Sequence, residues 1–150
     1  MLTLDIDSQY SQSDIPSNDK LEQWAAMAYL GNNSAEAALV IIDEAAMQTL
    51  NRDYRQADKT TNVLSFAANI GELDGVTHLG DIIVCAPVIS AEAQQQSKSI
   101  DAHWAHMLIH GMLHLQNYDH DNDDDAKVME NIEIELLAKI GISNPYKLLE

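Results

Sequence analysis

The sequence is short of cysteine and of long apolar runs. Its single cysteine, Cys85, cannot form a disulfide within the chain, so a reducing cytoplasm is the expected compartment. No apolar run approaches the roughly 18 residues that a membrane-spanning helix needs, and the first residues lack the basic and apolar parts of a secretory signal. We therefore expect a cytoplasmic protein with no membrane partner.

Basic side chains are also scarce: 8 lysines and arginines stand against 24 acidic residues, a net charge of −16. A surface that wraps nucleic acid needs many cations to neutralise phosphates, so no binding to DNA is expected. The charge is uneven, however. Arg52, Arg55 and Lys59 lie close together, whereas five aspartates crowd segment 119–125. Any contact with nucleic acid must therefore be local.

The 150 residues, 46% of them hydrophobic, suffice for one packed domain over positions 1–150. Four strands are predicted by alternating or β-branched apolar runs, at residues 2–6, 37–44, 62–66 and 80–84. Helical patterns start near Leu21 and cover residues 44–55, 86–98, 102–117 and 126–140. This order predicts an α+β single domain with a mixed sheet of about four strands packed with helices.

Helix ends are expected at four particular residues. Asp19 and Asp101 are predicted to open the first and fourth helices, because aspartate is a favoured N-cap. Pro87 suits the first turn of the third helix, and Gly141 is the expected stop of the last helix.

Five of the six histidines lie between positions 103 and 120, and three of them have the spacing of metal ligands. His110 and His114 are four residues apart, which places them on one helix face. His120 follows His110 at the interval of the third ligand in H-E-x-x-H-x-x-G-x-x-H zinc enzymes. Asn117 stands where those motifs carry glycine, and asparagine tolerates the left-handed conformation. The spacing therefore predicts a zinc site on a zincin-like helix.

Three neutral imidazoles leave one position of a tetrahedral zinc ion open, which is typical of a catalytic site. Binding to zinc lowers the pKa of water to about 7, so a nucleophile is available without a glutamate base. Gly111 occupies the position of that glutamate in the zinc proteases. A peptidase is therefore disfavoured.

The histidine segment has two other interpretations. The three histidines could be satisfied core residues, but packing alone rarely produces their spacing of four and then six residues with a helix-ending residue between. Asp119, Asp121, Asp123 and Glu130 match an EF-hand pattern, but Asp124 stands where its loop requires glycine. These acids are better explained as a helix start, with Asp119 orienting a histidine ligand.

The remaining histidines are not expected to bind the metal. His103 and His106 share the helical stripe, and we expect them behind the ligands or on a partly exposed surface. His78, in a predicted loop, is assigned no role.

The segment HGMLHLQNYDH (110–120), preceded by LNRDYRQADKTTNVLSF (50–66) and GDIIV (80–84), resembles the YbeY family of bacterial endoribonucleases and rRNA maturation factors. NPY at 144–146 is similar to the family's C-terminal pattern. Ala67 and Asn117 replace the proline and glycine of many members, and neither is a ligand.

The resemblance implies that His110, His114 and His120 hold one Zn²⁺ ion and that Arg55, His110 and His114 serve catalysis. It further implies a zinc-dependent endoribonuclease that prefers single-stranded RNA. The expected roles are 16S rRNA 3′-end maturation and ribosome quality control, with the ribosome or ribosomal proteins as partners.

Arg55 suits phosphodiester chemistry, because a guanidinium can grip two phosphate oxygens and offset developing charge. From the residues alone, a surface ion pair with a neighbour such as Asp58 is an equal alternative. Weak RNA affinity is expected. The RNA either contacts a local basic cleft at Arg52, Arg55 and Lys59 or is delivered within a ribosome or by a partner. A non-catalytic ribosome-assembly factor with a structural metal is the competing function, and the nucleophile, a 2′-OH or metal-bound water, is left open.

Overall fold

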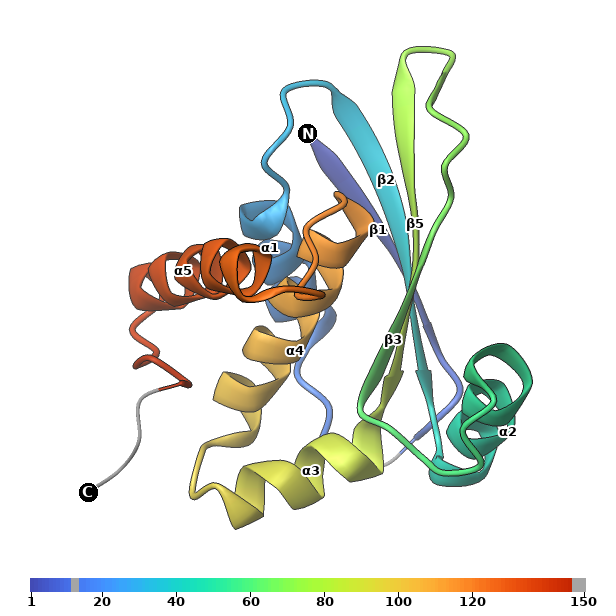
Figure 1. The fold of residues 1–150 in the computed structure, drawn as a ribbon, viewed down its shortest axis with the longest axis vertical. Helices are drawn as coiled ribbons and strands as arrows, with labels where there is room; N and C mark the ends of the chain where they lie inside the picture. Colours follow the sequence, from blue (N-terminus) through green and yellow to red (C-terminus); the bar gives the residue numbers. More distant parts are fainter. Residues whose placement is uncertain (12–13, 147–150) are drawn as a thin grey trace.

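The four predicted strands form one twisted sheet in a computed structural model that describes residues 1–11 and 14–146 (Figure 1). The strand order is β1 (Leu2–Ser8), β2 (Ser34–Ile42), β5 (Val76–Cys85) and β3 (Val63–Ala67). Strands β1, β2 and β5 are parallel to one another, and β3 runs antiparallel to β5. The α+β prediction with a mixed sheet is therefore confirmed.

A fifth, two-residue strand, β4 (Glu72–Leu73), lies in a segment expected to be a loop. It pairs antiparallel with the start of β5 through a tight turn at Asp74 and Gly75. Both turn residues have positive φ angles, 54° and 78°, as a type I′ hairpin requires, and Asp-Gly is among the pairs that favour this turn. The hairpin extends β5 four residues beyond its predicted start.

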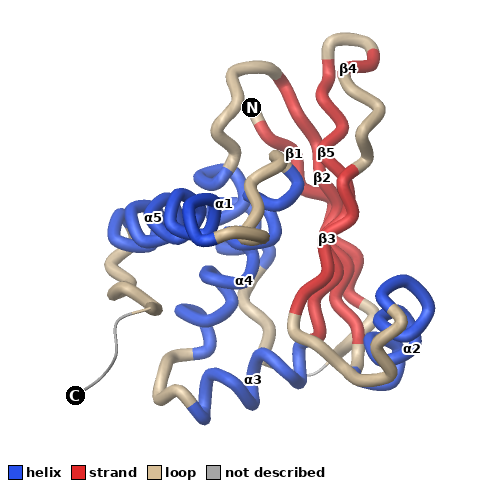
Figure 2. Tube along the Cα trace, viewed as in Figure 1, coloured by secondary structure: helices blue, strands red, loops and turns tan. Residues whose placement is uncertain are grey.

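Five helices pack around the sheet in the described part of the chain: α1 (Asn18–Ala28), α2 (Glu44–Arg55), α3 (Ala86–Gln95), α4 (Ile100–Leu115) and α5 (Asp123–Lys139). Figure 2 shows α1, α4 and α5 on one side of the sheet and α2 on the other. The main core lies between the sheet and helices α1 and α4, around the fully buried Leu39, Ile82 and Trp104. Within the described residues, no helix is both long enough and apolar enough to cross a membrane.

Two of the predicted N-caps are wrong by two residues. The N-caps are Ser17 and Ser99, whose hydroxyls accept from the N–H groups of Lys20 and Ala102 at 3.3 and 3.0 Å. Asp19 and Asp101 instead occupy the first turns, where a negative charge is favoured by the helix dipole. Each segment has two good candidate caps, and only the structure chooses the earlier one.

The other two helix-end predictions agree with the structure. Pro87 lies in the first turn of α3, and Gly141, with φ of 78°, follows the end of α5. Helix α4 differs from the rest because it is buried on nearly all sides, between the sheet, α1 and α5. The helix that carries the histidine motif is thus a central, rigid part of the fold.

Candidate metal centre

Three histidines converge at the C-terminal end of α4. One ring nitrogen from each of His110, His114 and His120 lies within 4.8 Å of the others. The Nε2 atoms of His110 and His114 are 3.1 Å apart. The first two rings are partly buried and the third is exposed, so the group opens to solvent on one side. The structure therefore brings together all three residues that the spacing selected.

A chain reversal after α4 returns His120 to the other two rings. Asn117 has a φ of 71°, in the left-handed region, and its N–H donates to the carbonyl of His114 at 3.0 Å. The N–H of Tyr118 donates to the carbonyl of Leu113 at 3.1 Å, which completes a Schellman motif. Asparagine thus performs the turn expected of it in place of glycine.

The carboxylate of Asp119 acts on the backbone rather than on a ring. It accepts from the N–H of His120 at 2.7 Å, and this hydrogen bond lowers the pKa of Asp119. Asp119 was expected to orient a histidine ligand, and the contact seen is to the backbone of one of the three histidines, His120. Its role in the structure is to fix the loop that carries His120.

The donor set fits a metal ion. With Zn–N bonds of about 2.0–2.1 Å, a tetrahedral ion holds two ligand nitrogens about 3.3 Å apart. The observed separation between the Nε2 atoms of His110 and His114, 3.1 Å, is close to that value. Burial, and then the neighbouring His110 and His120, lower the pKa of His114, so its neutral, ligating form is favoured. The three-histidine group could therefore hold a metal ion.

The rival EF-hand does not form. Asp123 to Asp125 lie in the first turn of α5, capped by Asn122, so the segment is helical where an EF-hand needs a loop. In the described part of the chain, the three histidines are the one group placed to hold a metal. Asp123 to Asp125 thus form a helix start, as expected, whereas Asp119 and Asp121 lie in the loop before it.

A cleft of about 570 Å³ opens over the histidines. One wall is the lead-in to β3 and the strand itself, residues 61–67, and Arg55 projects into the cleft from the last turn of α2. Arg52 and Lys59, expected to share this basic cleft, are not among its walls. Asp119 and Asp121 do line the cleft. Arg55 is therefore the one basic side chain lining the cleft among the described residues.

Arg55 is also free of the surface ion pair that was its alternative. Within the described residues, no carboxylate lies within 4.0 Å of its guanidinium. Asp58, the suggested partner, accepts instead from the Nε2 of Gln48 at 3.1 Å. The charge of Arg55 is thus available to a substrate in the cleft.

Glu133 is the residue that sequence reasoning missed. Its side chain, on α5, is fully buried, and its oxygens accept from the Nδ1 of His110 at 3.0 Å and the Nε2 of His106 at 3.1 Å. Tyr146 donates its hydroxyl to the same carboxylate. Burial alone would raise the pKa of Glu133, but these hydrogen bonds outweigh it and lower the pKa to about 2.

A signal for Glu133 was present in the pattern of α5. Met129, Leu136 and Leu137 are buried, and position 133 falls on the same stripe at helical spacing. A carboxylate within an apolar stripe requires buried partners. Those partners lie on α4 and after α5, so the pattern marks the residue without identifying its contacts.

His103 and His106 are both buried, so the expectation of a partly exposed surface is wrong. The Nε2 of His103 donates to Glu92 at 2.9 Å, and His106 shares Glu133 with His110. Among the residues that the structure describes, the buried Nδ1 atoms of both rings have no hydrogen-bond partner. His106 therefore lies behind the candidate metal ligands, which was the alternative to surface exposure.

Gly111 faces the sheet and not the cleft. A Cβ atom there would lie 2.9 Å from Cγ2 of Ile82 and 3.3 Å from Oγ of Ser65. The position that carries the glutamate base in zinc proteases therefore has no room for a side chain here. The close packing at Gly111 thus excludes the glutamate that a zinc peptidase would use as its general base.

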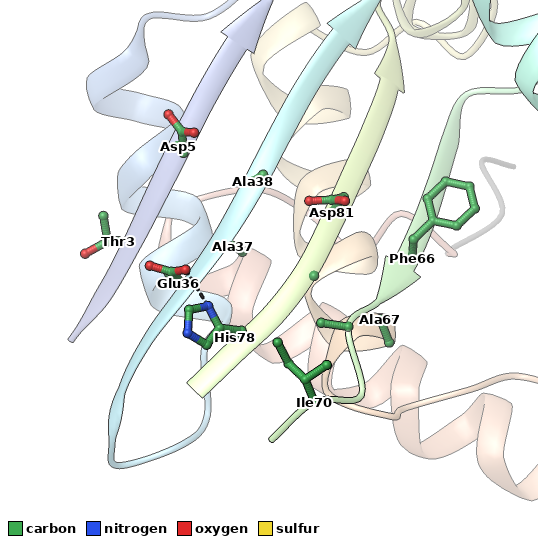
Figure 3. A pocket seen from close by; sticks show the side chains of 12 residues that line it. Thr3, Asp5, Glu36, Ala37, Ala38, Phe66, Ala67, Ile70, His78 and Asp81 are labelled. Atoms are coloured by element: carbon green, nitrogen blue, oxygen red, sulfur yellow. Dashed lines mark ion pairs between the residues drawn. The ribbon is translucent and has the colours of Figure 1, made fainter. Parts of the chain in front are cut away.

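A second hollow, of about 460 Å³, lies on the face of the sheet away from α4 (Figure 3). Asp5, Glu36 and Asp81 point into it from three neighbouring strands. His78 was expected in a loop but lies in β5, where it pairs with Glu36 of β2. This hollow contains none of the three clustered histidines.

An α+β fold with three clustered histidines beside an open cleft is typical of metal-dependent hydrolases. A family model described as Endoribonuclease YbeY matches residues 5–141. This chain belongs to that family.

Individual relatives agree with the assignment. The chain is 45% identical over 145 residues to the protein named Endoribonuclease YbeY from Cellvibrio japonicus, covering 95% of this chain and 82% of the relative. The protein of the same name from Alteromonas mediterranea is 47% identical over 135 residues, covering 89% and 85%. A solution structure of TM1509 from Thermotoga maritima is similar in fold, with a TM-score of 0.56 and 22% identity, covering 97% of this chain and 100% of that chain.

Proposed function

We propose that the chain, residues 1–150, is one hydrolase domain that cleaves phosphodiester bonds in RNA with a zinc ion held by His110, His114 and His120. Membership of the endoribonuclease YbeY family supports the reaction. The observation that carries the assignment of residues is the convergence of the three histidines and Arg55 on one cleft. We assign His110 and His114 to catalysis through the metal they hold.

The chemistry divides between the metal and the side chains. A zinc ion bound here would supply a Lewis acid beside the phosphodiester. Arg55 binds the non-bridging oxygens, because its guanidinium offers a planar pair of donors and makes no competing ion pair. Its positive charge stabilises the transition state more than the ground state when negative charge builds up on these non-bridging oxygens during attack.

The substrate we infer is single-stranded rRNA within the ribosome. The family resemblance supports 16S rRNA 3′-end maturation and ribosome quality control as the setting. The net charge of −16 supports weak binding of free RNA, and so does the cleft lining, in which Arg55 is the one lysine or arginine among the residues that the structure describes. Ribosomal proteins, which are basic, would then help to present the RNA to this acidic chain.

The first experiment compares cleavage of a short single-stranded RNA by the zinc-loaded wild-type protein and its Arg55→Ala variant. Removing one preorganised charge should lower the cleavage rate about 100- to 1000-fold. Arg52→Ala is the matched control, since Arg52 pairs with Asp53 at 3.3 Å outside the cleft. Arg55→Lys should recover only part of the rate, because lysine lacks the planar fork.

Two outcomes would redirect the proposal. No cleavage of free RNA or of ribosomal particles by the wild-type protein would favour a non-catalytic assembly factor with a structural metal. Equal loss in Arg55→Ala and Arg52→Ala would indicate a general charge effect. Where cleavage occurs, a 2′,3′-cyclic phosphate product would identify the 2′-OH as the nucleophile.

A further inference from the structure

The carboxylate of Glu133 lies directly behind the metal centre. Its Oε2 is 3.0 Å from the Nδ1 of His110, whose other ring nitrogen, Nε2, faces the Nε2 of His114 at 3.1 Å. Glu133 is fully buried, so no water competes for its oxygens. One imidazole thus connects the buried carboxylate to the open side of the site.

The chemistry of these contacts selects one tautomer of His110. An ionised carboxylate can only accept hydrogen bonds, so the Nδ1 of His110 must carry the hydrogen. In the neutral ring, the lone pair then lies on Nε2, the atom that faces His114. This is the form that a metal ion between the two rings requires.

Glu133 is itself held by two further donors. His106 donates its Nε2–H to Oε1 at 3.1 Å, and the hydroxyl of Tyr146 donates to the carboxylate from the segment after α5. The same hydroxyl lies 3.1 Å from Oε2 and 3.2 Å from the Nε2 of His106. The carboxylate therefore cannot rotate away from His110 without breaking contacts to two other elements.

We propose that Glu133 is a positioning residue of the metal centre, which fixes His110 in the Nδ1–H tautomer, and that Tyr146 holds Glu133 in that position. The inference rests on the proposed role of His110 as a ligand. It assigns a function to the segment after α5, since Tyr146 connects that segment to the metal site through one carboxylate. Partners of this kind typically change metal affinity 10- to 100-fold when removed.

Glu133→Gln is the sharpest test, because an amide has one acceptor oxygen and one donor NH₂ group. His106 and His110 donate to different oxygens of Glu133, and in glutamine one of these oxygens is replaced by an NH₂ group. One of the two histidines must then change tautomer or lose its present hydrogen bond. We expect zinc affinity, measured by competition with a chromogenic chelator, to fall about 10- to 100-fold. In ¹⁵N NMR spectra of the metal-free protein, we expect the His110 signals to lose the pattern of a pure Nδ1–H tautomer.

Glu135→Gln is the matched control, since Glu135 is exposed on the same helix and loses the same charge. It should retain wild-type zinc affinity and the wild-type His110 tautomer. If Glu133→Gln also retains both, the proposal is wrong. A purely structural role would lower the unfolding temperature of Glu133→Gln and leave the tautomer and zinc affinity unchanged, which would equally overturn it.

Tyr146→Phe keeps the test valid if Glu133→Gln does not fold. Tyr146 is 40% exposed, so removing its hydroxyl leaves the core packing intact. A loss of zinc affinity smaller than that expected for Glu133→Gln supports the proposal, and an unchanged affinity and tautomer overturn it. Both readouts need no RNA, so they separate failure of this inference from failure of the proposed nuclease activity.

Discussion

The two halves of α4 use the same residue type in different ways. In the first half, His103 and His106 are buried, and each donates to a carboxylate. In the second half, His110 and His114 turn their Nε2 atoms toward each other at the edge of a cleft, where His120 joins them. All four helical histidines lie on related faces of one helix, so their spacing alone does not separate the two pairs.

Solvent access and the partners of each ring nitrogen separate the pairs. Helices α3 and α5 cover the first half and supply Glu92 and Glu133. The second half borders the cleft and is open to solvent there. Glu133 contacts the Nδ1 of His110 and leaves its Nε2 facing the cleft. A histidine can bind a metal where one ring nitrogen donates to a buried carboxylate and the other ring nitrogen faces an open cleft.

The largest expected effect comes from Gly111, the residue between His110 and Met112 that faces the sheet. Gly111→Glu forces a long, charged side chain into the packed contact that Gly111 makes with Ile82 and Ser65. We expect a loss of about 3–5 kcal/mol of unfolding free energy, the cost of an uncompensated buried charge. Urea unfolding measures this loss of unfolding free energy. The variant restores the H-E-x-x-H pattern, but we expect it to show no peptidase activity.

Gly111→Ala is the matched control for that variant. Its methyl group overpacks the contact with Ile82, which typically costs about 1–3 kcal/mol, while alanine regains about 1 kcal/mol of helix propensity. A Gly111→Glu protein with the wild-type urea midpoint would contradict the packing of α4 on the sheet.

The second prediction removes one histidine from each half. His114→Ala should lower zinc affinity and RNA cleavage by more than about 100-fold, beyond the usual loss from an outer partner. His103→Gln should leave both unchanged, because glutamine can still donate to Glu92. Chelator competition and a cleavage assay measure the two effects. Equal losses of zinc affinity and cleavage in the two variants would show that the two halves of α4 do not differ in function.

The third prediction concerns stability with and without metal. Zinc at 100 times its dissociation constant should stabilise the folded protein by about 2.7 kcal/mol, if it binds only the folded state. Thermal unfolding with added zinc, and again after a chelator, measures the gain. The His103→Gln protein should keep the gain and His114→Ala should lose it. Stabilisation of His114→Ala by zinc would place the metal elsewhere.

The smallest effect is a dependence of stability on pH from His103. Burial lowers the pKa of this ring, and its unpartnered Nδ1 agrees, since a protonated ring would bury an unsatisfied N–H. Below its ordinary pKa of about 6.5, the unfolded state takes up a proton more readily than the folded state. The contribution of neutral His103 to the free energy of unfolding is therefore fully present above pH 6.5 and is lost as the pH falls below that value.

His103→Gln tests this pH dependence. One proton contributes at most about 1.4 kcal/mol per pH unit, so the variant should lose less stability than the wild type between pH 7 and pH 5. Urea unfolding at several pH values measures the difference. Parallel curves for the two proteins would mean that His103 is protonated equally in both states.

The sequence predicted most of the regular structure because local periodicity defines it. The strands and helices are where the apolar patterns placed them, apart from boundaries and the short β4. The fifth strand was missed because two residues carry no periodicity, although the Asp74–Gly75 turn was a readable signal. The serine caps were missed because a neighbouring aspartate in each segment is an equally good cap.

The sequence by itself determined the group of three histidines, because a helix fixes the positions of residues four apart and Asn117 permits the turn that returns His120. Tertiary structure alone decided how that group is supported. Glu133 follows His110 by 23 residues, Arg55 comes from a helix on the other side of the sheet, and Gly111 meets Ile82 from β5. Contacts between distant segments depend on how helices and strands pack, and no local period records that packing.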